Sequence, residues 1–165
     1  IWRPFNIIGL HERAEGYEPG VCHVFADFIQ RIVREHQNPM MVLGTGEQIR
    51  CFTWIGDVAG AIARWSFDPL TTNESFNLGN REPVTMIDLA QRIWRLYHEA
   101  VGRPPAEELT FTHADTYADD VQVRIPAVDK ARETLGWEAQ VKLDEMLRRC
   151  LAHELEHEPA GVGTA

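Results

Sequence analysis

The sequence predicts an α/β fold built around one core. Short segments rich in Ile, Val, Phe and Trp alternate with segments whose apolar residues recur every three or four positions, and Gly or Pro separates many of them. The chain has 165 residues, of which 44% are hydrophobic and 25% charged, as in an ordinary globular domain. The predicted strands are short and irregularly spaced, so the sequence indicates the fold class more clearly than the topology.

The predicted strands share an enrichment in β-branched and aromatic residues and end near Gly or polar turn residues. They cover residues 1–8, 40–43, 49–55, 75–78 and 109–112. A polar loop containing Gly and Pro follows the first strand at 10–20, and a second polar loop follows the last strand and ends near Asp120.

Five helices are predicted from apolar periodicity and from residues that begin or end a helix. The first begins at Val21, has apolar residues at 21, 24, 25, 28, 29, 32 and 33, and ends before Asn38-Pro39. Asp57 is the expected N-cap of the second, and Thr85-Met-Ile-Asp88 has the form of a capping box for the third. The last two lie near 129–135 and 143–155, and residues 159–165 are expected to form a flexible tail of small residues.

The charge distribution argues against several classes of protein. Asp and Glu number 25 and Lys and Arg 16, so the formal net charge is −9. The basic residues are spread along the chain, whereas binding to nucleic acid requires a clustered basic surface. No apolar stretch approaches the length of a membrane span, and no leader opens the chain, which predicts a cytoplasmic protein without membrane partners. Because the chain begins with Ile1 inside an apolar run, we expect it to start within a longer protein.

The three cysteines and one histidine pair suggest structural roles. Cys22, Cys51 and Cys150 are far apart and form no C-x-x-C motif, so buried free thiols are expected. Residues 153–157 match the zinc motif H-E-x-x-H, but Pro159 follows at once and few residues remain to supply a third ligand. We therefore interpret this segment as a charged, solvated helix end and expect no metal.

Several catalytic patterns are missing. The sequence contains no phosphate-binding G-x-x-x-x-G-K-[ST], no G-x-G-x-x-G, no G-x-S-x-G and no Y-x-x-x-K. Gly44-Thr-Gly46 by itself predicts only a turn. Arg50 and Arg124 stand among aromatic and apolar residues, and a guanidinium can hold a phosphate through two parallel hydrogen bonds. Considered alone, each arginine is better interpreted as a surface or ion-paired residue than as a phosphate ligand.

Four segments taken in order resemble the second half of the extended short-chain dehydrogenases that act on nucleotide sugars, the NAD-dependent epimerase/dehydratase family. They are RPFNIIG at 3–9, VLGTGEQIRCFTWIGDV at 42–58, FNLG at 76–79 and KARETLGW at 130–137. The resemblance implies a partial Rossmann-like fold, mainly the smaller mixed α/β substrate-binding domain, with the N-terminal dinucleotide-binding half missing. The expected division is a nucleotide-sugar-binding domain at 1–152 and a helix end with a tail at 153–165.

The resemblance also implies roles for individual residues. Asn6 would contact the sugar diphosphate, Met41 and Leu43 would line the nucleotide base, Arg50 would hold the diphosphate, and Phe52 would form a wall of the same pocket. Arg124 would also reach the diphosphate, and Pro4 would lie where the backbone approaches the nicotinamide. The family's catalytic set and most contacts to NAD(P) would belong to the missing half, and the complete protein would be a homodimer.

Some residues depart from the family's pattern and bear on the reaction. Leu10 replaces a Pro, Cys51 and Ala127 each replace an Asp, and the 10–23 segment is longer than in the decarboxylases. The long segment favours an epimerase resembling UDP-glucose 4-epimerase, which acts by transient hydride transfer at the sugar. The alternatives are a 4,6-dehydratase, a UDP-glucuronate decarboxylase, or a module that binds a nucleotide sugar without catalysis. Without the missing half, the strands at 1–8 and 75–78 are expected to lack partners.

Overall fold

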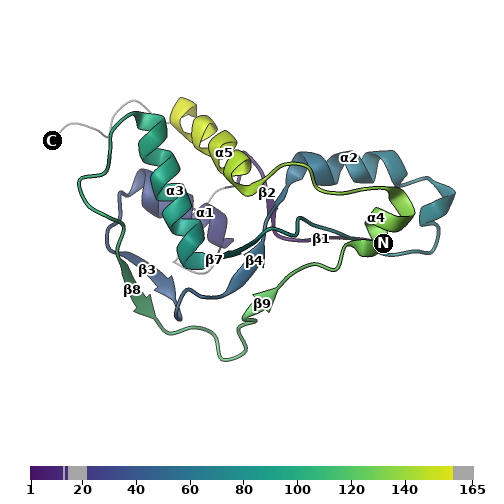
Figure 1. Cartoon of the computed structure of the whole chain (residues 1–165), viewed down its shortest axis with the longest axis horizontal. Coiled ribbons are helices and arrows are strands. Elements are labelled where there is room, and N and C mark those ends of the chain that lie inside the picture. Colours follow the sequence, from purple (N-terminus) through teal and green to yellow (C-terminus); the bar gives the residue numbers. More distant parts are fainter. Residues whose placement is uncertain (13, 15–21, 158–165) are drawn as a thin grey trace.

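The computed structural model describes residues 1–12, 14 and 22–157 and has the predicted α/β architecture (Figure 1). The strands are β1 (Trp2–Pro4), β2 (Ile7–Ile8), β3 (Met40–Leu43), β4 (Ile49–Cys51), β5 (Thr53–Trp54), β6 (Phe76–Leu78), β7 (Pro83–Thr85), β8 (Phe111–Ala114) and β9 (Val123–Arg124). The α-helices are α1 (Val24–Ile29), α2 (Ile55–Trp65), α3 (Met86–Val101), α4 (Asp129–Leu135) and α5 (Leu143–His157). A π-helix, η1 (Gln30–Arg34), extends α1, and a 3₁₀ turn, η2 (Pro69–Thr71), follows α2.

The strand predicted at 1–8 is two strands with different partners. β1 pairs in parallel with β6, with Trp2 opposite Phe76, and β2 pairs in parallel with β5, with Ile7 opposite Thr53. The chain changes direction at Asn6, whose φ of 39° interrupts the extended backbone. The expectation that the strands at 1–8 and 75–78 would lack partners is wrong, because β1 and β6 pair with each other. Within the described residues, no third strand joins this pair.

The segment predicted as one strand at 49–55 is also divided. β4 lies between β7, which is antiparallel to it, and β9, which is parallel to it, whereas β5 pairs with β2. Neither β7 nor β9 is predicted from the sequence. Their two or three residues are extended because the neighbouring strand β4 offers hydrogen bonds, and such short segments carry little periodic signal of their own.

Helix α2 begins at Ile55, so the prediction that Asp57 is its N-cap is wrong. Trp54 occupies the N-cap position without a side-chain cap, and Asp57 lies in the first turn. Its carboxylate instead accepts hydrogen bonds from the backbone N–H groups of Gln140 and Val141, at 2.8 and 3.0 Å. Asp57 therefore joins α2 to the segment that leads into α5, a contact 83 residues away in sequence.

Other helix ends agree with the predictions. The Thr85 hydroxyl accepts a hydrogen bond from the Asp88 N–H at 3.1 Å and caps α3, which ends at Gly102 with φ 67°. Gly136 ends α4 in the same left-handed conformation. The predicted first helix is α1 together with η1, and Val21 lies outside the described residues, as does most of the 10–20 loop and the tail from 158 onward.

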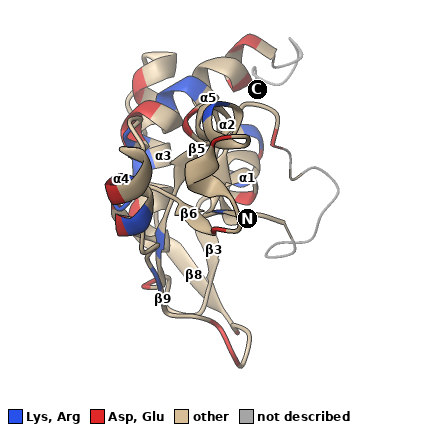
Figure 2. Cartoon of the chain, turned by 90° about the vertical axis from the view of Figure 1, so that its right-hand side faces the viewer, with Lys and Arg blue, Asp and Glu red and all other residues tan. Residues whose placement is uncertain are grey.

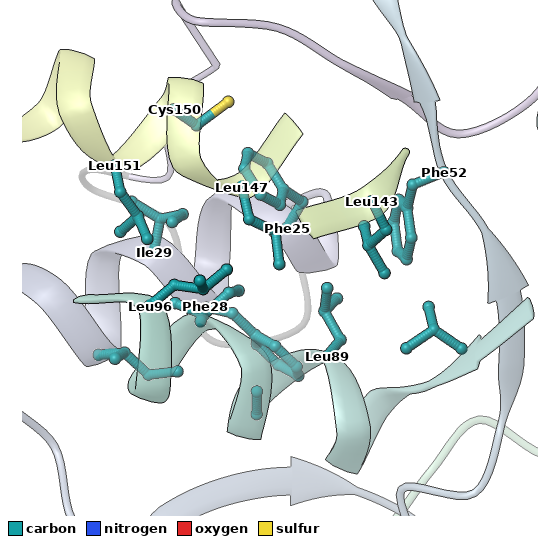
Figure 3. Close-up of a cluster of buried hydrophobic side chains, with 14 of the residues drawn as sticks. Phe25, Phe28, Ile29, Phe52, Leu89, Leu96, Leu143, Leu147, Cys150 and Leu151 are labelled. Carbon is teal, nitrogen blue, oxygen red and sulfur yellow. The ribbon is translucent and has the colours of Figure 1, made fainter. Parts of the chain in front are cut away.

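The buried residues form two clusters, not the single core that the chain length predicts. The larger one lies where α1, α3 and α5 pack together, and Figure 3 shows Phe25, Phe28 and Leu147 converging there. The smaller one contains Trp65, Phe76 and Trp137 and lies between α2, β6 and α4. Figure 1 places these two groups of helices at opposite ends of the molecule, connected by extended strands. α5 is continuous across residue 152, and the division at that position remains a prediction.

Basic and acidic residues both occur along the helices (Figure 2). On α3, for example, Arg92 pairs with Asp88 at 3.0 Å and with Asp144 of α5 at 3.1 Å. Within the described residues, no helix combines the length and the apolar character needed to cross a membrane.

Candidate functional site

Two neighbouring cavities contain six of the seven residues predicted to bind substrate or cofactor. Cavity A has a volume of about 150 Å³ and lies between α1, β3, β4 and the loop that follows β8. Cavity B has a volume of about 370 Å³ and lies between the β1–β2 segment and the start of α1. Val24 lines both cavities, so they adjoin each other.

Cavity A contains Met41, Leu43 and Arg50. Met41 and Leu43 are two residues apart on β3, and alternate side chains of a strand point to the same face. The residue between them, Val42, and the preceding Met40 are buried in the larger core. β3 therefore packs Met40 and Val42 into the core and presents Met41 and Leu43 to the cavity, and Val42 also contributes to the cavity lining.

Arg50 brings a positive charge to this apolar cavity. Its Nη1 donates to the Ile49 carbonyl at 2.9 Å, and its Nη2 pairs with Asp120 Oδ1 at 3.2 Å. The Asp120 carboxylate also accepts from Gln48 Nε2 at 3.0 Å and from the Thr116 hydroxyl at 3.2 Å. Only 15% of the Arg50 side chain is exposed, which strengthens its interaction with any anion it contacts.

A buried ion pair that the sequence analysis did not single out also lines cavity A. Arg31 Nη2 lies 2.5 Å from Asp27 Oδ2, and Arg31 Nη1 donates to the Met41 carbonyl at 2.6 Å. Burial raises the pKa of the Asp27 carboxyl, and the charge and hydrogen bond of Arg31 oppose that rise. The spacing of four residues on a predicted helix is the signal that could have identified this pair.

Cavity B contains Pro4, Asn6 and Phe52, together with Glu12 and His23. Asn6 Nδ2 donates to the Cys51 carbonyl at 2.9 Å, and the Asn6 carbonyl accepts from the Thr53 N–H at 3.0 Å. These bonds hold a residue with positive φ, a conformation that Asn tolerates better than most residues. The position of Asn6 is therefore fixed by β4 and β5.

Thr53 is a further residue that the sequence analysis did not identify. It is completely buried, its hydroxyl donates to the Phe5 carbonyl at 2.9 Å, and the same oxygen accepts from the Asn80 N–H at 3.0 Å. It thereby connects the turn at Asn6 with the end of β6. A threonine inside a predicted strand gives no sequence signal for such a role.

Arg124 lines neither of these two cavities. It is exposed on β9, where it lies directly opposite Arg50 in the parallel pairing of β9 with β4. The two guanidinium groups thus come from neighbouring strands, but only Arg50 is enclosed.

The H-E-x-x-H segment forms part of α5. Glu154 is only 5% exposed, and its Oε2 lies 2.6 Å from Arg34 Nη2, so the expectation of a fully solvated helix end is wrong at this residue. The His153 and His157 ring centroids are 4.1 Å apart. Within the described part of the chain, no group of three or more His, Cys, Asp or Glu side chains is arranged to hold a metal ion.

All three cysteines are free thiols. Cys51 and Cys150 are buried as predicted, but Cys22 is only half-buried, so the prediction of burial is wrong for Cys22. Burial raises the pKa of the Cys150 thiol to about 12, with smaller contributions from Glu12 and Glu154. The thiol is therefore neutral and unreactive near pH 7.

Parallel strand pairs and helices, with one cavity beside β3 and β4 and a second beside the β1–β2 segment, give a partial Rossmann-like α/β fold. The matches to epimerases, decarboxylases and dehydratases place this fold in the extended short-chain dehydrogenase class. Comparison with known proteins identifies the family. The chain belongs to the GDP-mannose 4,6 dehydratase family, whose model matches residues 1–150.

The chain is similar in sequence to relatives that have different activities. The chain is 34% identical to UDP-glucuronic acid decarboxylase 1 of Arabidopsis thaliana over 141 residues, which are 82% of this chain and 29% of the relative. It is 35% identical to UDP-glucuronate 4-epimerase of Thermodesulfobacterium geofontis over 124 residues, which are 74% of this chain and 34% of the relative. The chain thus spans about a third of these relatives.

Solved structures confirm the partial fold. UDP-glucose 4-epimerase of Thermotoga maritima, solved with UDP-glucose, superimposes with a TM-score of 0.69 and 26% identity over 94% of this chain and 45% of that one. The dTDP-glucose 4,6-dehydratase of Bacillus anthracis, solved with NAD, superimposes with a TM-score of 0.73 over 95% of this chain and 44% of that one. The identity is 14%, so this structure supports the fold alone.

Proposed function

We propose that this chain is the nucleotide-sugar-binding portion of an NAD(P)-dependent sugar-nucleotide epimerase. The observation that carries the proposal is the position of Arg50 beside Met41 and Leu43 in one partly enclosed cavity. An apolar slot suits the faces of a nucleotide base, and a guanidinium in the same cavity suits the diphosphate attached to it.

The two cavities suggest how such a ligand would lie. We place the base in cavity A, the diphosphate at Arg50, and the sugar toward cavity B, where Asn6 and Phe52 provide a polar group and an aromatic wall. Arg124, opposite Arg50, supplies a second positive charge near the diphosphate. This order places the sugar near Pro4, at the end of β1.

NAD(P) is the cofactor expected for the complete enzyme, and it would supply the hydride acceptor when bound. The exposed Pro4 at the mouth of cavity B is the residue of this chain that we assign to the nicotinamide side. A proline there presents no N–H and leaves a flat apolar surface, which is compatible with an aromatic ring. We place the remaining cofactor contacts and the catalytic set in an N-terminal half, and we expect the complete protein to be a homodimer.

A decarboxylase is the second candidate. It is supported by the 34% identity to UDP-glucuronic acid decarboxylase 1, whereas the 35% identity to UDP-glucuronate 4-epimerase supports an epimerase. A 4,6-dehydratase and a non-catalytic nucleotide-sugar module are the remaining alternatives. The three reactions differ in mass: an epimerase leaves the mass of the nucleotide sugar unchanged, a dehydratase removes water, and a decarboxylase releases CO₂.

The test uses the protein expressed from its complete reading frame, with UDP-glucose and UDP-glucuronate as probes. Calorimetry should show that Arg50→Ala weakens binding by more than about tenfold, because a charge-assisted contact to phosphate is lost. Arg81→Ala is the matched control, since Arg81 is 57% exposed and pairs with Asp129 away from both cavities. Equal affinities of Arg50→Ala and the unaltered protein would contradict the proposal. Mass spectrometry of the products then detects the loss of water by a dehydratase or of CO₂ by a decarboxylase, and proton NMR of the sugar distinguishes an epimer of unchanged mass from unreacted substrate.

A further inference from the structure

The Asp120 carboxylate lies where an anion bound to Arg50 would be expected. It faces Nη2 of Arg50 at 3.2 Å, and 19% of the Asp120 side chain is exposed. The other acid that lines cavity A, Asp27, is already paired with Arg31 at 2.5 Å. Asp120 is therefore the acidic group that competes directly with a phosphate for Arg50.

The contacts of Asp120 form a small network. Its Oδ1 faces Arg50, while its Oδ2 accepts from Gln48 Nε2 at 3.0 Å and from the Thr116 hydroxyl at 3.2 Å. Gln48 is 5% exposed, and its Nε2 also donates to the Leu43 carbonyl at 3.1 Å. Asp120 thus accepts hydrogen bonds from Arg50 on β4, from Gln48 just before β4 and from Thr116 on its own loop.

The loop that carries Asp120 is attached to the sheet at both ends. The Gly44 N–H donates to the Ala114 carbonyl at 2.8 Å, and the Ile49 N–H donates to the Gln122 carbonyl at 2.7 Å. Between these anchors, the Asp120 N–H closes a turn on the Tyr117 carbonyl at 3.1 Å. Movement of the Asp120 side chain away from Arg50 therefore requires no change in the pairing of β3 with β8 or of β4 with β9.

We propose that Asp120 is an internal competitor for the phosphate site, and that nucleotide binding exchanges the Asp120–Arg50 ion pair for a phosphate–Arg50 contact. This inference rests on the proposed function, because it takes Arg50 as the residue that holds the diphosphate. A carboxylate in this position lowers the affinity for every phosphate ligand, since each must first displace it. It leaves the affinity for an uncharged nucleoside unchanged.

The variant Asp120→Asn tests the exchange. An asparagine keeps the size of the side chain and an oxygen for Gln48 and Thr116, but it removes the negative charge that faces Arg50. Isothermal titration with UDP and with uridine should show UDP bound about threefold to tenfold more tightly, as expected for loss of a partly buried ion pair, and uridine bound as before. Asp119→Asn is the matched control, because Asp119 is an exposed acid on the same loop.

Two further comparisons decide between explanations. In an Arg50→Ala background, Asp120→Asn should have no additional effect on UDP, since the competition requires Arg50. The inference is overturned if Asp120→Asn weakens UDP and uridine equally, if it leaves UDP binding unchanged, or if Asp119→Asn tightens UDP binding as much. If Arg50→Ala alone leaves UDP binding unchanged, the proposed function itself fails, so the two failures are distinguishable.

Discussion

Arg34 and Glu154 form an ion pair across 120 residues of sequence, with Nη2 of Arg34 2.6 Å from Oε2 of Glu154. The pair joins η1 to α5 at the edge of the larger core. Glu154 is 5% exposed, whereas 25% of the Arg34 side chain is exposed. Glu154 therefore has less access to water than Arg34, and its charge is stabilised more by the ion pair than the charge of Arg34 is.

The first prediction concerns this pair. Arg34→Ala should lower the free energy of unfolding by about 2 kcal/mol, because the buried Glu154 carboxylate loses its ion pair with Arg34. Urea denaturation measures the change. Arg149→Ala, which removes the exposed pair with Glu145 on the same helix α5, should cost less than about 1 kcal/mol. Equal costs for the two variants would show that burial of Glu154 does not matter.

The second prediction concerns two glycines in different environments. Gly46→Ala should destabilise the fold, because φ is +76° and the added Cβ would lie 2.6 Å from Ile87 Cγ1. Gly60→Ala lies within α2, where the added Cβ meets no atom within 4 Å, and should stabilise by up to about 1 kcal/mol. Thermal unfolding of both variants measures the difference in stability. A stabilising Gly46→Ala would show that neither the positive φ nor the contact with Ile87 requires a glycine at this position.

The third prediction concerns the N-cap of α3. Thr85→Ala should cost about 1 kcal/mol, because the Asp88 N–H loses its acceptor at the start of a 16-residue helix. Thr85→Ser keeps a hydroxyl and should retain most of the stability. Urea denaturation of the two variants separates capping from packing of the threonine methyl group: a serine variant as unstable as the alanine variant would indicate that packing dominates.

The fourth prediction concerns pH. The pKa of the Cys150 thiol is about 12 in the folded protein against an ordinary value of 9.0, so the unfolded chain loses this proton first as the pH rises. The folded state is therefore not destabilised by this thiol below about pH 9. Between about pH 9 and 12 the free energy of unfolding falls, because only the unfolded chain releases the proton. At pH 10 the loss from this group amounts to about 1.4 kcal/mol relative to pH 8.

The variant Cys150→Ala isolates this effect. Its free energy of unfolding should fall less between pH 8 and pH 10 than that of the unaltered protein, because the other titrating groups are common to both. Urea denaturation at the two pH values gives the difference. Parallel decreases in the two proteins would mean that Cys150 is accessible to solvent in the folded state.

The helices and the outline of the site follow from local sequence. Three local signals predict the helices: the apolar stripe at 24–33, the cap at Thr85, and the glycines at 102 and 136. Each acts within a few residues, so the sequence alone is enough to predict its effect. The ordered motifs around Asn6 and Arg50 likewise indicated the family, which the match over residues 1–150 confirms.

Contacts between distant segments decided the remainder. The sequence at 1–8 has the composition of one strand, but hydrogen bonds from β5 and β6 divide it at Asn6. Asp57 has the chemistry of an N-cap, but two N–H groups at 140 and 141 lie within its reach. β9 exists because β4 lies beside it, and that pairing sets Arg124 opposite Arg50. Local propensity determined the helices because their hydrogen bonds close within four residues, whereas strands, buried charges and cavities take their partners from elsewhere in the chain and were decided only by the tertiary structure.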